Sequence, residues 1–211
     1  SALFPAGALL PPADGTVIRG INSPAVYLVN KGKLQLYSAL TFDQYNVAKK
    51  IQIVPEQEIP LYPKEGFVAP LNGSLIRTSE NPTVYLVEEG LKRGLSAELF
   101  RNRGLSFKNL VIISSDEMNA LASGGIAAPK DLTYFQSLPS NQLFLYKNGA
   151  KHRIYNFVAS QRKISPDFSF DDPLVSSWED GLPIAPKDNT VLKSDSDPTV
   201  YLGLNGQLRA L

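Results

Sequence analysis

The feature that most constrains this sequence is an internal repeat with a period of about 58 residues. An aromatic residue and a turn glycine recur together at that interval, as Tyr27 with Gly32, Tyr85 with Gly90, Phe144 with Gly149, and Tyr201 with Gly206. A fixed period with retained glycines is typical of repeat architecture, in which single copies are too small to close a core and pack on their neighbours. We therefore divide the chain into the expected tail of a preceding repeat (1–12), three repeats (13–70, 71–129, 130–186) and a partial fourth repeat (187–211).

Each repeat is expected to contain a β-hairpin and a short helix. In the first repeat, residues 16–19 and 25–29 are β-rich, and the Asn30-Lys31-Gly32 turn returns the chain through 33–37. Ser38 stands at a helix-cap position before a helical stretch that ends at Tyr45, and 51–54 read as a further strand. The equivalents in the second repeat are a helix at 96–103, capped by Ser96, and a strand at 110–113.

The sequence predicts a mainly β fold with short helices, an α+β repeat. Residues 84–87 and 143–146 are apolar on both alternating faces, which indicates central strands covered on both sides. Prolines precede the first strand of every copy, where a missing amide donor costs least. The repeats are expected to form either a propeller-like ring or an open array; the prolines are Pro12, Pro70, Pro129 and Pro186.

Composition excludes several classes of function. Lys plus Arg (21) nearly balance Asp plus Glu (20), so nucleic acid is not an expected partner. The absence of cysteine excludes a disulfide framework, a thiol nucleophile and a cysteine-based zinc site. No run approaches the roughly 20 apolar residues that span a bilayer, and the first residues are not a signal peptide. We expect a segment of a longer, secreted protein.

Aromatic residues are the first candidates for ligand contact. Aromatic faces commonly hold sugar rings, and the series that includes Tyr85 and Tyr201 would present them at regular intervals. Because these residues lie in the most apolar strand, and Phe144 replaces tyrosine in the third repeat, core packing is the competing interpretation. Trp178 stands in the polar stretch Ser176-Ser-Trp-Glu-Asp-Gly and is the leading single candidate for a contact, although it could also cover the edge of its own repeat.

A second set of candidates is basic and lies on the return strand of the hairpin. Lysines and arginines recur there and could line one face that meets an anionic wall polymer or an acidic protein. A solvated edge strand protected by charge is the alternative. His152 occupies a slot that other repeats fill with Gln35, Arg93 or Arg209, so it is not expected to be a catalytic base. The ligand-binding candidates of this set are Arg93, His152, Arg153 and Arg209.

Acidic residues offer no site. The pairs Asp171-Asp172 and Asp195-Ser-Asp197 lack the spacing of a calcium loop, and no two acids are paired for glycoside hydrolysis. With no cysteine, one poorly placed histidine and no Gly-x-Ser-x-Gly motif, an enzyme is the least expected class. We expect no metal and no cofactor.

Residues 73–100, with Gly-Ser-Leu-Ile-Arg, Pro-Thr-Val-Tyr-Leu-Val, Gly-x-Lys-Arg and Ser-Ala-Glu-Leu-Phe, resemble tandem repeats of secreted bacterial surface proteins. Such repeats accompany S-layer, cell-wall or peptidase modules. The resemblance implies an extracellular or cell-surface location and two hypotheses for function. One is a carbohydrate-binding module that holds wall glycan or polysaccharide through many weak contacts. The other is a structural spacer or protein-docking segment of a surface layer, pilus or adhesin.

Overall fold

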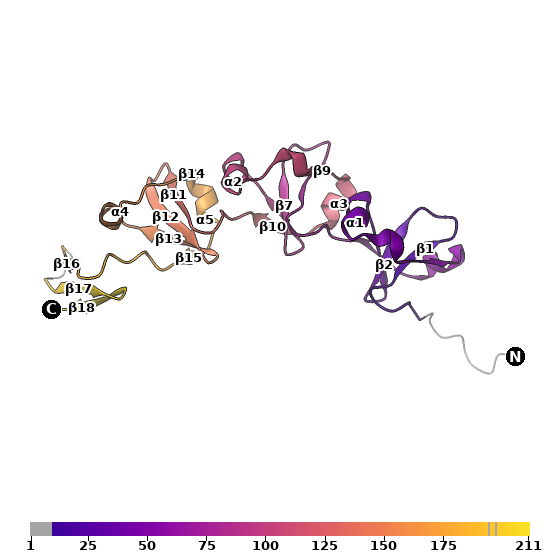
Figure 1. Cartoon of the computed structure of the whole chain (residues 1–211), viewed down its shortest axis with the longest axis horizontal. Helices are drawn as coiled ribbons and strands as arrows, with labels where there is room; N and C mark the ends of the chain where they lie inside the picture. The colour runs from indigo at the N-terminus through magenta and orange to yellow at the C-terminus, as the bar shows by residue number, and fades with distance from the viewer. Residues whose placement is uncertain (1–9, 194, 197) are drawn as a thin grey trace. The chain divides into compact units, whose positions relative to one another are not determined.

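The computed structural model describes residues 10–193, 195, 196 and 198–211. Within these residues the chain is mainly β, with four open sheets and a few short helices, as the sequence predicted (Figure 1). Its contacts divide it into two compact units. Unit 1 is the chain up to Gly94 together with Phe107–Gly125, and unit 2 is Leu95–Ser106 together with Ile126–Leu211.

Unit 1 contains two five-stranded sheets with the same plan. The first sheet has the order β4-β1-β2-β3-β5 and the second the order β10-β8-β7-β6-β9. In the first sheet the strands are β1 (Val17–Gly20), β2 (Val26–Asn30), β3 (Lys33–Leu36), β4 (Ile51–Val54) and β5 (Lys64–Phe67). In the second they are β6 (Leu75–Arg77), β7 (Tyr85–Glu88), β8 (Leu91–Gly94), β9 (Leu110–Ile112) and β10 (Ser123–Ile126).

Unit 2 contains the third and fourth sheets. The third has the order β14-β11-β12-β13-β15, with β11 (Thr133–Leu138), β12 (Gln142–Lys147), β13 (Ala150–Ile154), β14 (Phe168–Asp171) and β15 (Asp180–Gly181). The fourth has three strands in the order β16-β17-β18, which are β16 (Val191–Lys193), β17 (Val200–Leu204) and β18 (Gln207–Ala210).

The helices are short and follow the hairpins. Those after the return strands are α1 (Ala39–Gln44), α2 (Ala97–Asn102) and α4 (Asn156–Arg162). Those after the parallel strands are η2 (Glu56–Leu61), α3 (Ser115–Ala120) and α5 (Asp172–Ser176), and α5 lies beside β14 (Figure 1). Two further 3₁₀ turns are η1 (Val47–Lys49) and η3 (Phe107–Asn109).

The predicted helices and their caps are confirmed. The Ser38 hydroxyl accepts a hydrogen bond from the Thr41 N–H at 3.3 Å, and the Ser96 hydroxyl accepts one from the Leu99 N–H at 3.2 Å. These bonds satisfy amides that the first helical turn leaves without a partner. The predicted strands 51–54 and 110–113 appear as β4 and β9.

The hairpin turns are also as predicted. In each of the four copies a residue with positive φ precedes a glycine with positive φ, which is the type I′ geometry that suits a two-residue hairpin. In the first turn the φ angles are 51° at Lys31 and 72° at Gly32. The equivalent pairs are Glu89-Gly90, Asn148-Gly149 and Asn205-Gly206.

The middle strand of each five-stranded sheet is buried on both faces, as the apolar pattern predicted. Neighbouring residues of β1 show the same arrangement on a flanking strand: Val17 packs in a cluster with Val26 and Val47, whereas Ile18 packs in another cluster with Val29 and Leu34. Since consecutive side chains point to opposite faces, both faces of the sheet carry a core.

The three five-stranded sheets exceed the three or four strands expected per repeat because the Pro-rich closing segment also pairs. It forms β5, β10 or β15 at one edge, and β5 and β15 are parallel to the return strand. The opposite edge strand is parallel to the first strand of its sheet. Propeller blades are four-stranded and lie around a central channel, so these open mixed sheets correct the propeller-like expectation.

Candidate functional site

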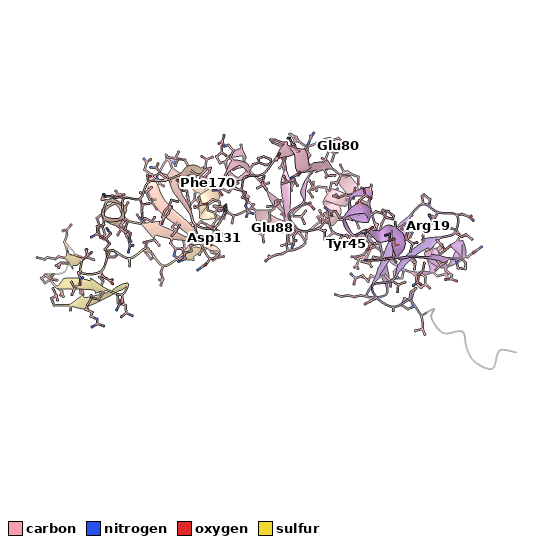
Figure 2. The ribbon with its side chains drawn as sticks, in the orientation of Figure 1. Arg19, Tyr45, Glu80, Glu88, Asp131 and Phe170 are labelled. Atoms are coloured by element: carbon pink, nitrogen blue, oxygen red, sulfur yellow. The ribbon has the colours of Figure 1, made fainter. Side chains whose placement is uncertain are left out.

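Trp178 is a core residue of unit 2 and is only 6% exposed. Its ring lies edge-on to Phe135 and to Phe170, with centroids 5.5 Å and 5.4 Å apart, and Phe170 is labelled on β14 in Figure 2. The indole N–H donates to the Ala127 carbonyl at 3.3 Å. The expectation of a contact residue is corrected, because a ring in this position has no free face for a ligand.

The repeat itself contained the signal for this burial. The Leu34, Lys92 and Lys151 amides donate to the carbonyls of Pro63, Ala122 and Glu179, and this places Trp178 at the position of Tyr62 and Leu121 in the earlier repeats. Both of those residues are buried. All three repeats have a large buried side chain at this position, but the polar residues around Trp178 made it look like an exposed loop residue.

The other aromatic candidates lie in or beside the cores. Tyr27 and Phe144 are buried, and Tyr85 is half-buried against the cluster around Ile76. Tyr201 is half-buried on β17. The structure therefore places each ring of this series in a strand, where it is buried or half-buried.

Arg93 and His152 occupy the same place on the return strands and lie across the closing segment. The Arg93 Nη1 donates to the Gly124 carbonyl at 2.6 Å, and the His152 Nδ1 lies 2.7 Å from the Leu182 carbonyl oxygen. A Cβ on Gly181 would stand 2.4 Å from the His152 Cε1, so a larger residue there would displace the His152 ring. These two side chains hold the closing segment against its sheet.

Two lysines one position earlier perform a similar task. The Lys92 Nζ donates to the Met118 carbonyl at 2.6 Å, and the buried Lys151 Nζ donates to the Trp178 carbonyl. Lys151 also pairs with Asp180 at 3.0 Å. A buried ammonium group requires such partners. Several basic side chains of the return strands thus bond to backbone carbonyls of their own repeat.

The remaining basic candidates are exposed. Arg153 lies over the ring of Tyr155, 5.1 Å from its centroid, in a cation–π contact. Arg209 lies on the exposed strand β18.

A carboxylate joins the first hairpin loop to the chain after the parallel strand in every full repeat. Glu56 accepts from the Asn22 N–H at 3.2 Å, and Glu80 accepts from the Ser115 hydroxyl at 3.0 Å. Asp172 accepts from the hydroxyls of Ser137 and Ser140, and the first of these bonds contributes most to lowering its pKa. Asp172 therefore has a structural role in this loop.

The polar groups that recur most regularly form joints between a helix and the following sheet. We use "joint" for the contact of a helix C-terminus with the turn before the next first strand. In unit 1, the Gln44 Nε2 donates to the Ser74 hydroxyl at 2.7 Å, and its Oε1 accepts from the Leu71 N–H at 2.9 Å. Tyr45, which is labelled in Figure 2, donates from its hydroxyl to the Ala69 carbonyl at 3.2 Å.

The first joint in unit 2 uses the same chemistry. The Asn102 Nδ2 donates to the Thr133 hydroxyl at 3.0 Å, and its Oδ1 accepts from the Lys130 N–H at 2.7 Å. The neighbouring Arg103 Nε donates to the Ala128 carbonyl at 2.6 Å. Asn102 and Thr133 are both buried, so each amide and hydroxyl group needs this partner.

The second joint in unit 2 ties α4 to the turn before β16. The Gln161 Nε2 donates to the Thr190 hydroxyl at 3.0 Å, and its Oε1 accepts from the Lys187 N–H at 3.2 Å. Arg162 donates to the Ala185 carbonyl at 3.0 Å. The three joints thus share an amide side chain followed by a second hydrogen-bond donor.

Our sequence reasoning missed these joints, although the period contains them. The three amides are spaced at 58 and 59 residues, at Gln44, Asn102 and Gln161. Their hydroxyl partners recur at nearly the same interval, at Ser74, Thr133 and Thr190. Amides and hydroxyls are common on surfaces, so only the recurrence of both at one period distinguishes them.

The described residues contain no group of three or more acidic or histidine side chains that could hold a metal ion, and Asp197 lies outside them. A cavity of about 10 Å³ lies between β5 and α3. It has room for about one water molecule and is too small for a sugar. None of the described helices is long and apolar enough to cross a membrane.

No known protein family matches the sequence, and no curated protein is significantly similar to it. Among solved structures, the periplasmic assembly from the ESX-5 inner membrane complex aligns at 12% identity with a TM-score of 0.26, over 100% of this chain and 71% of that one. An intact ESX-5 inner membrane complex aligns at 12% identity with a TM-score of 0.25, over 99% of this chain and 61% of that one. Scores this low do not establish a shared fold.

Proposed function

We propose that this chain is a non-catalytic, structural and protein-docking segment of a cell-surface or envelope assembly, built as an open array of tandem repeats. The observation that carries the proposal is the recurring joint: an amide, then a second donor, at the end of α1, α2 and α4. Because the same polar contacts tie α1, α2 and α4 to the turns that follow them, the recurring polar groups of the repeat connect one copy to the next.

The disposition of the other polar groups supports this proposal over a carbohydrate-binding module. Trp178 is in a core, and Arg93 and Lys151 donate to carbonyls of their own repeat. A glycan site needs exposed aromatic faces with convergent polar groups, and these residues are engaged within the fold. The extracellular location belongs to the same proposal and rests on the resemblance to surface-protein repeats.

The proposal is tested by loosening all joints at once. A triple variant, Gln44→Ala with Asn102→Ala and Gln161→Ala, should remain folded by circular dichroism but give a broader distribution of interatomic distances in small-angle X-ray scattering. The matched control is Asn156→Ala, which removes an exposed amide from α4 without touching a joint. A triple variant that scatters like the wild type would contradict a connecting role.

The competing function is tested directly by sedimentation of the purified segment with isolated cell walls and insoluble polysaccharides. The structural proposal predicts no saturable binding to any polymer. Saturable binding to a purified polysaccharide, lost in Arg93→Ala or Arg209→Ala but retained in the joint variant, would replace the proposal with the glycan-binding hypothesis. Fractionation of producing cells with an antibody to this segment tests the location.

A further inference from the structure

The turn that receives a helix in each joint has the same conformation in all four copies. Its second residue has positive φ, at 88° in Gly73, 62° in Leu132 and 65° in Asn189, and the first copy has 85° at Gly15. An aspartate or asparagine before it accepts from the hairpin turn of the same copy; these residues are Asp14, Asn72, Asp131 and Asp188. The first copy thus contains a fully formed receiving turn.

In the first copy this turn has no helix upon it within the described residues. The groups equivalent to those used in the joints are the N–H of Ala13, the hydroxyl of Thr16 and the carbonyl of Pro11. Within 10–193, 195, 196 and 198–211, no hydrogen bond reaches any of these three groups. The Thr16 N–H does donate to the Ala13 carbonyl at 3.1 Å, just as the Ser74 N–H donates to Leu71 at 3.1 Å.

A second observation comes from the apolar side of the joint in unit 1. There α3 packs against β5 of the preceding copy, where a Cβ on Gly66 would lie 3.6 Å from the Ala120 Cβ. The residue equivalent to Ala120 in the first copy is Leu61 of η2, which is 61% exposed. A large apolar side chain therefore stands where a preceding closing strand would cover it.

We propose that the turn formed by Pro11, Ala13 and Thr16 is the receiving half of a further joint. Its occupant is the helix of a repeat placed directly before it in the same polypeptide, with glutamine or asparagine at its end and tyrosine or arginine next. This rests on the proposed function as a connecting array. It identifies the partner by chemistry: an amide to bridge Ala13 and Thr16, and a donor for Pro11.

A second copy of this chain does not offer such a helix. The amides at the ends of α1, α2 and α4 are already bonded within their own joints. In each of those joints the amide precedes its partners in the turn by 26 to 31 residues of the same chain, as Asn102 precedes Thr133 by 31 and Gln161 precedes Lys187 by 26. Every described joint therefore connects a helix to a later turn of the same polypeptide, and we expect the same connection for the first copy.

The test extends the chain by one repeat. A copy of residues 13–70 is inserted between Pro12 and Ala13, so that a second Gln44 faces Ala13 and Thr16 while the added Ala69 takes the place of Pro11. Amide hydrogen exchange is then followed by NMR. In the original chain the amides of Leu71, Lys130 and Lys187 should be protected, whereas Ala13 should exchange rapidly. In the extended chain exchange at Ala13 should slow about fivefold, the factor that corresponds to a net hydrogen-bond contribution of about 1 kcal/mol.

Gln44→Ala in the added copy alone should restore rapid exchange at Ala13 and leave Leu71 protected. Rapid exchange at Ala13 in the extended chain, with Leu71 still protected, would overturn this inference and spare the proposed function. Rapid exchange at Leu71, Lys130 and Lys187 in the original chain would overturn both, because the joints themselves would then not form in solution.

Discussion

Individual side chains in this protein are explained by their position in the repeat more than by their neighbours in sequence. Trp178 lies in a polar stretch, yet it fills the place of Tyr62 and Leu121 in a core. Its burial could be predicted only by aligning the closing segments, in which the third repeat is the most divergent. Asp172, which reads as part of an acidic pair, likewise proves to be a hydrogen-bond acceptor for two serines.

Replacing Trp178 tests its place in the core. Trp178→Ala should lower the free energy of unfolding by about 3–5 kcal/mol, the usual cost of removing a buried aromatic ring. The measurement is urea unfolding followed by circular dichroism. In the wild type the emission of this single tryptophan should be blue-shifted and resistant to acrylamide. A stable alanine variant and strongly quenched emission would show that the ring is exposed.

Asp172 predicts a dependence of stability on acid. Hydrogen bonds from the Ser137 hydroxyl, the Ser140 hydroxyl and the Ser140 N–H lower its folded pKa below the ordinary value of 3.8, although partial desolvation opposes them. A lowered folded pKa contributes stability above the unfolded pKa, and that contribution is lost as the pH falls through the folded pKa. The urea concentration at the unfolding midpoint of the wild type should therefore decrease as the pH is lowered below about 4.

Asp172→Asn provides the comparison for this acid effect. The variant should be less stable than the wild type at pH 7, and the difference should shrink as the pH falls toward and below the folded pKa of Asp172. Ser137→Ala should have the same effect on the pH profile because it removes the strongest donor. Profiles that stay parallel from pH 7 into acid would show that the carboxylate does not carry this stability.

At the scale of elements, the hairpins and helices can be predicted from residues close together in the sequence, whereas the joints cannot. The type I′ turns and the caps at Ser38 and Ser96 are formed by residues within a few positions of one another, so the sequence predicts them. The pairing of Gln161 with Thr190 spans 29 residues. Which helix meets which turn depends on the tertiary arrangement, even though the repeating amides mark the positions.

The joint at α4 should control the order of the fourth sheet. This sheet has three strands and little buried area of its own, so its packing depends on neighbours. Gln161→Ala leaves the Lys187 N–H and Thr190 hydroxyl without their partner, which should lower the opening free energy of β17 by about 1–3 kcal/mol. Amide exchange in β17 measures this loss.

Asn156→Ala is the control for the joint, since Asn156 is an exposed amide on the same helix. It should leave exchange in β17 unchanged. Equal effects of the two substitutions would mean that α4 acts on the fourth sheet only through its general helical stability. No effect of either would show that the fourth sheet holds itself without the joint.

At the scale of the whole molecule, the compact units do not coincide with the sequence repeats. The second repeat is divided, because α2 belongs with the third sheet in unit 2 while β9 and α3 belong to unit 1. The repeat boundaries mark where the sequence recurs, whereas the units mark where side chains pack. The boundaries of the units and of the repeats differ because the helix of one repeat packs with the sheet of the next.

The two units should respond separately to core substitutions. Ile76 is fully buried in unit 1, and Ile76→Ala should cost about 2–5 kcal/mol there. Trp178 reports on unit 2, so its fluorescence midpoint in urea should not move in this variant, whereas Phe135→Ala should lower it. A lower tryptophan fluorescence midpoint in Ile76→Ala would show that the two units unfold together as one cooperative body.

The period, the hairpins, the capped helices and the mainly β composition could be predicted from the sequence, because hairpins and helix caps depend on residues close in the chain. The folded structure was needed to show that the sheets are open, that Trp178 is in a core, and that Gln44, Asn102 and Gln161 join helices to following turns. These features depend on burial and on hydrogen bonds between residues far apart in the chain, which no local pattern specifies.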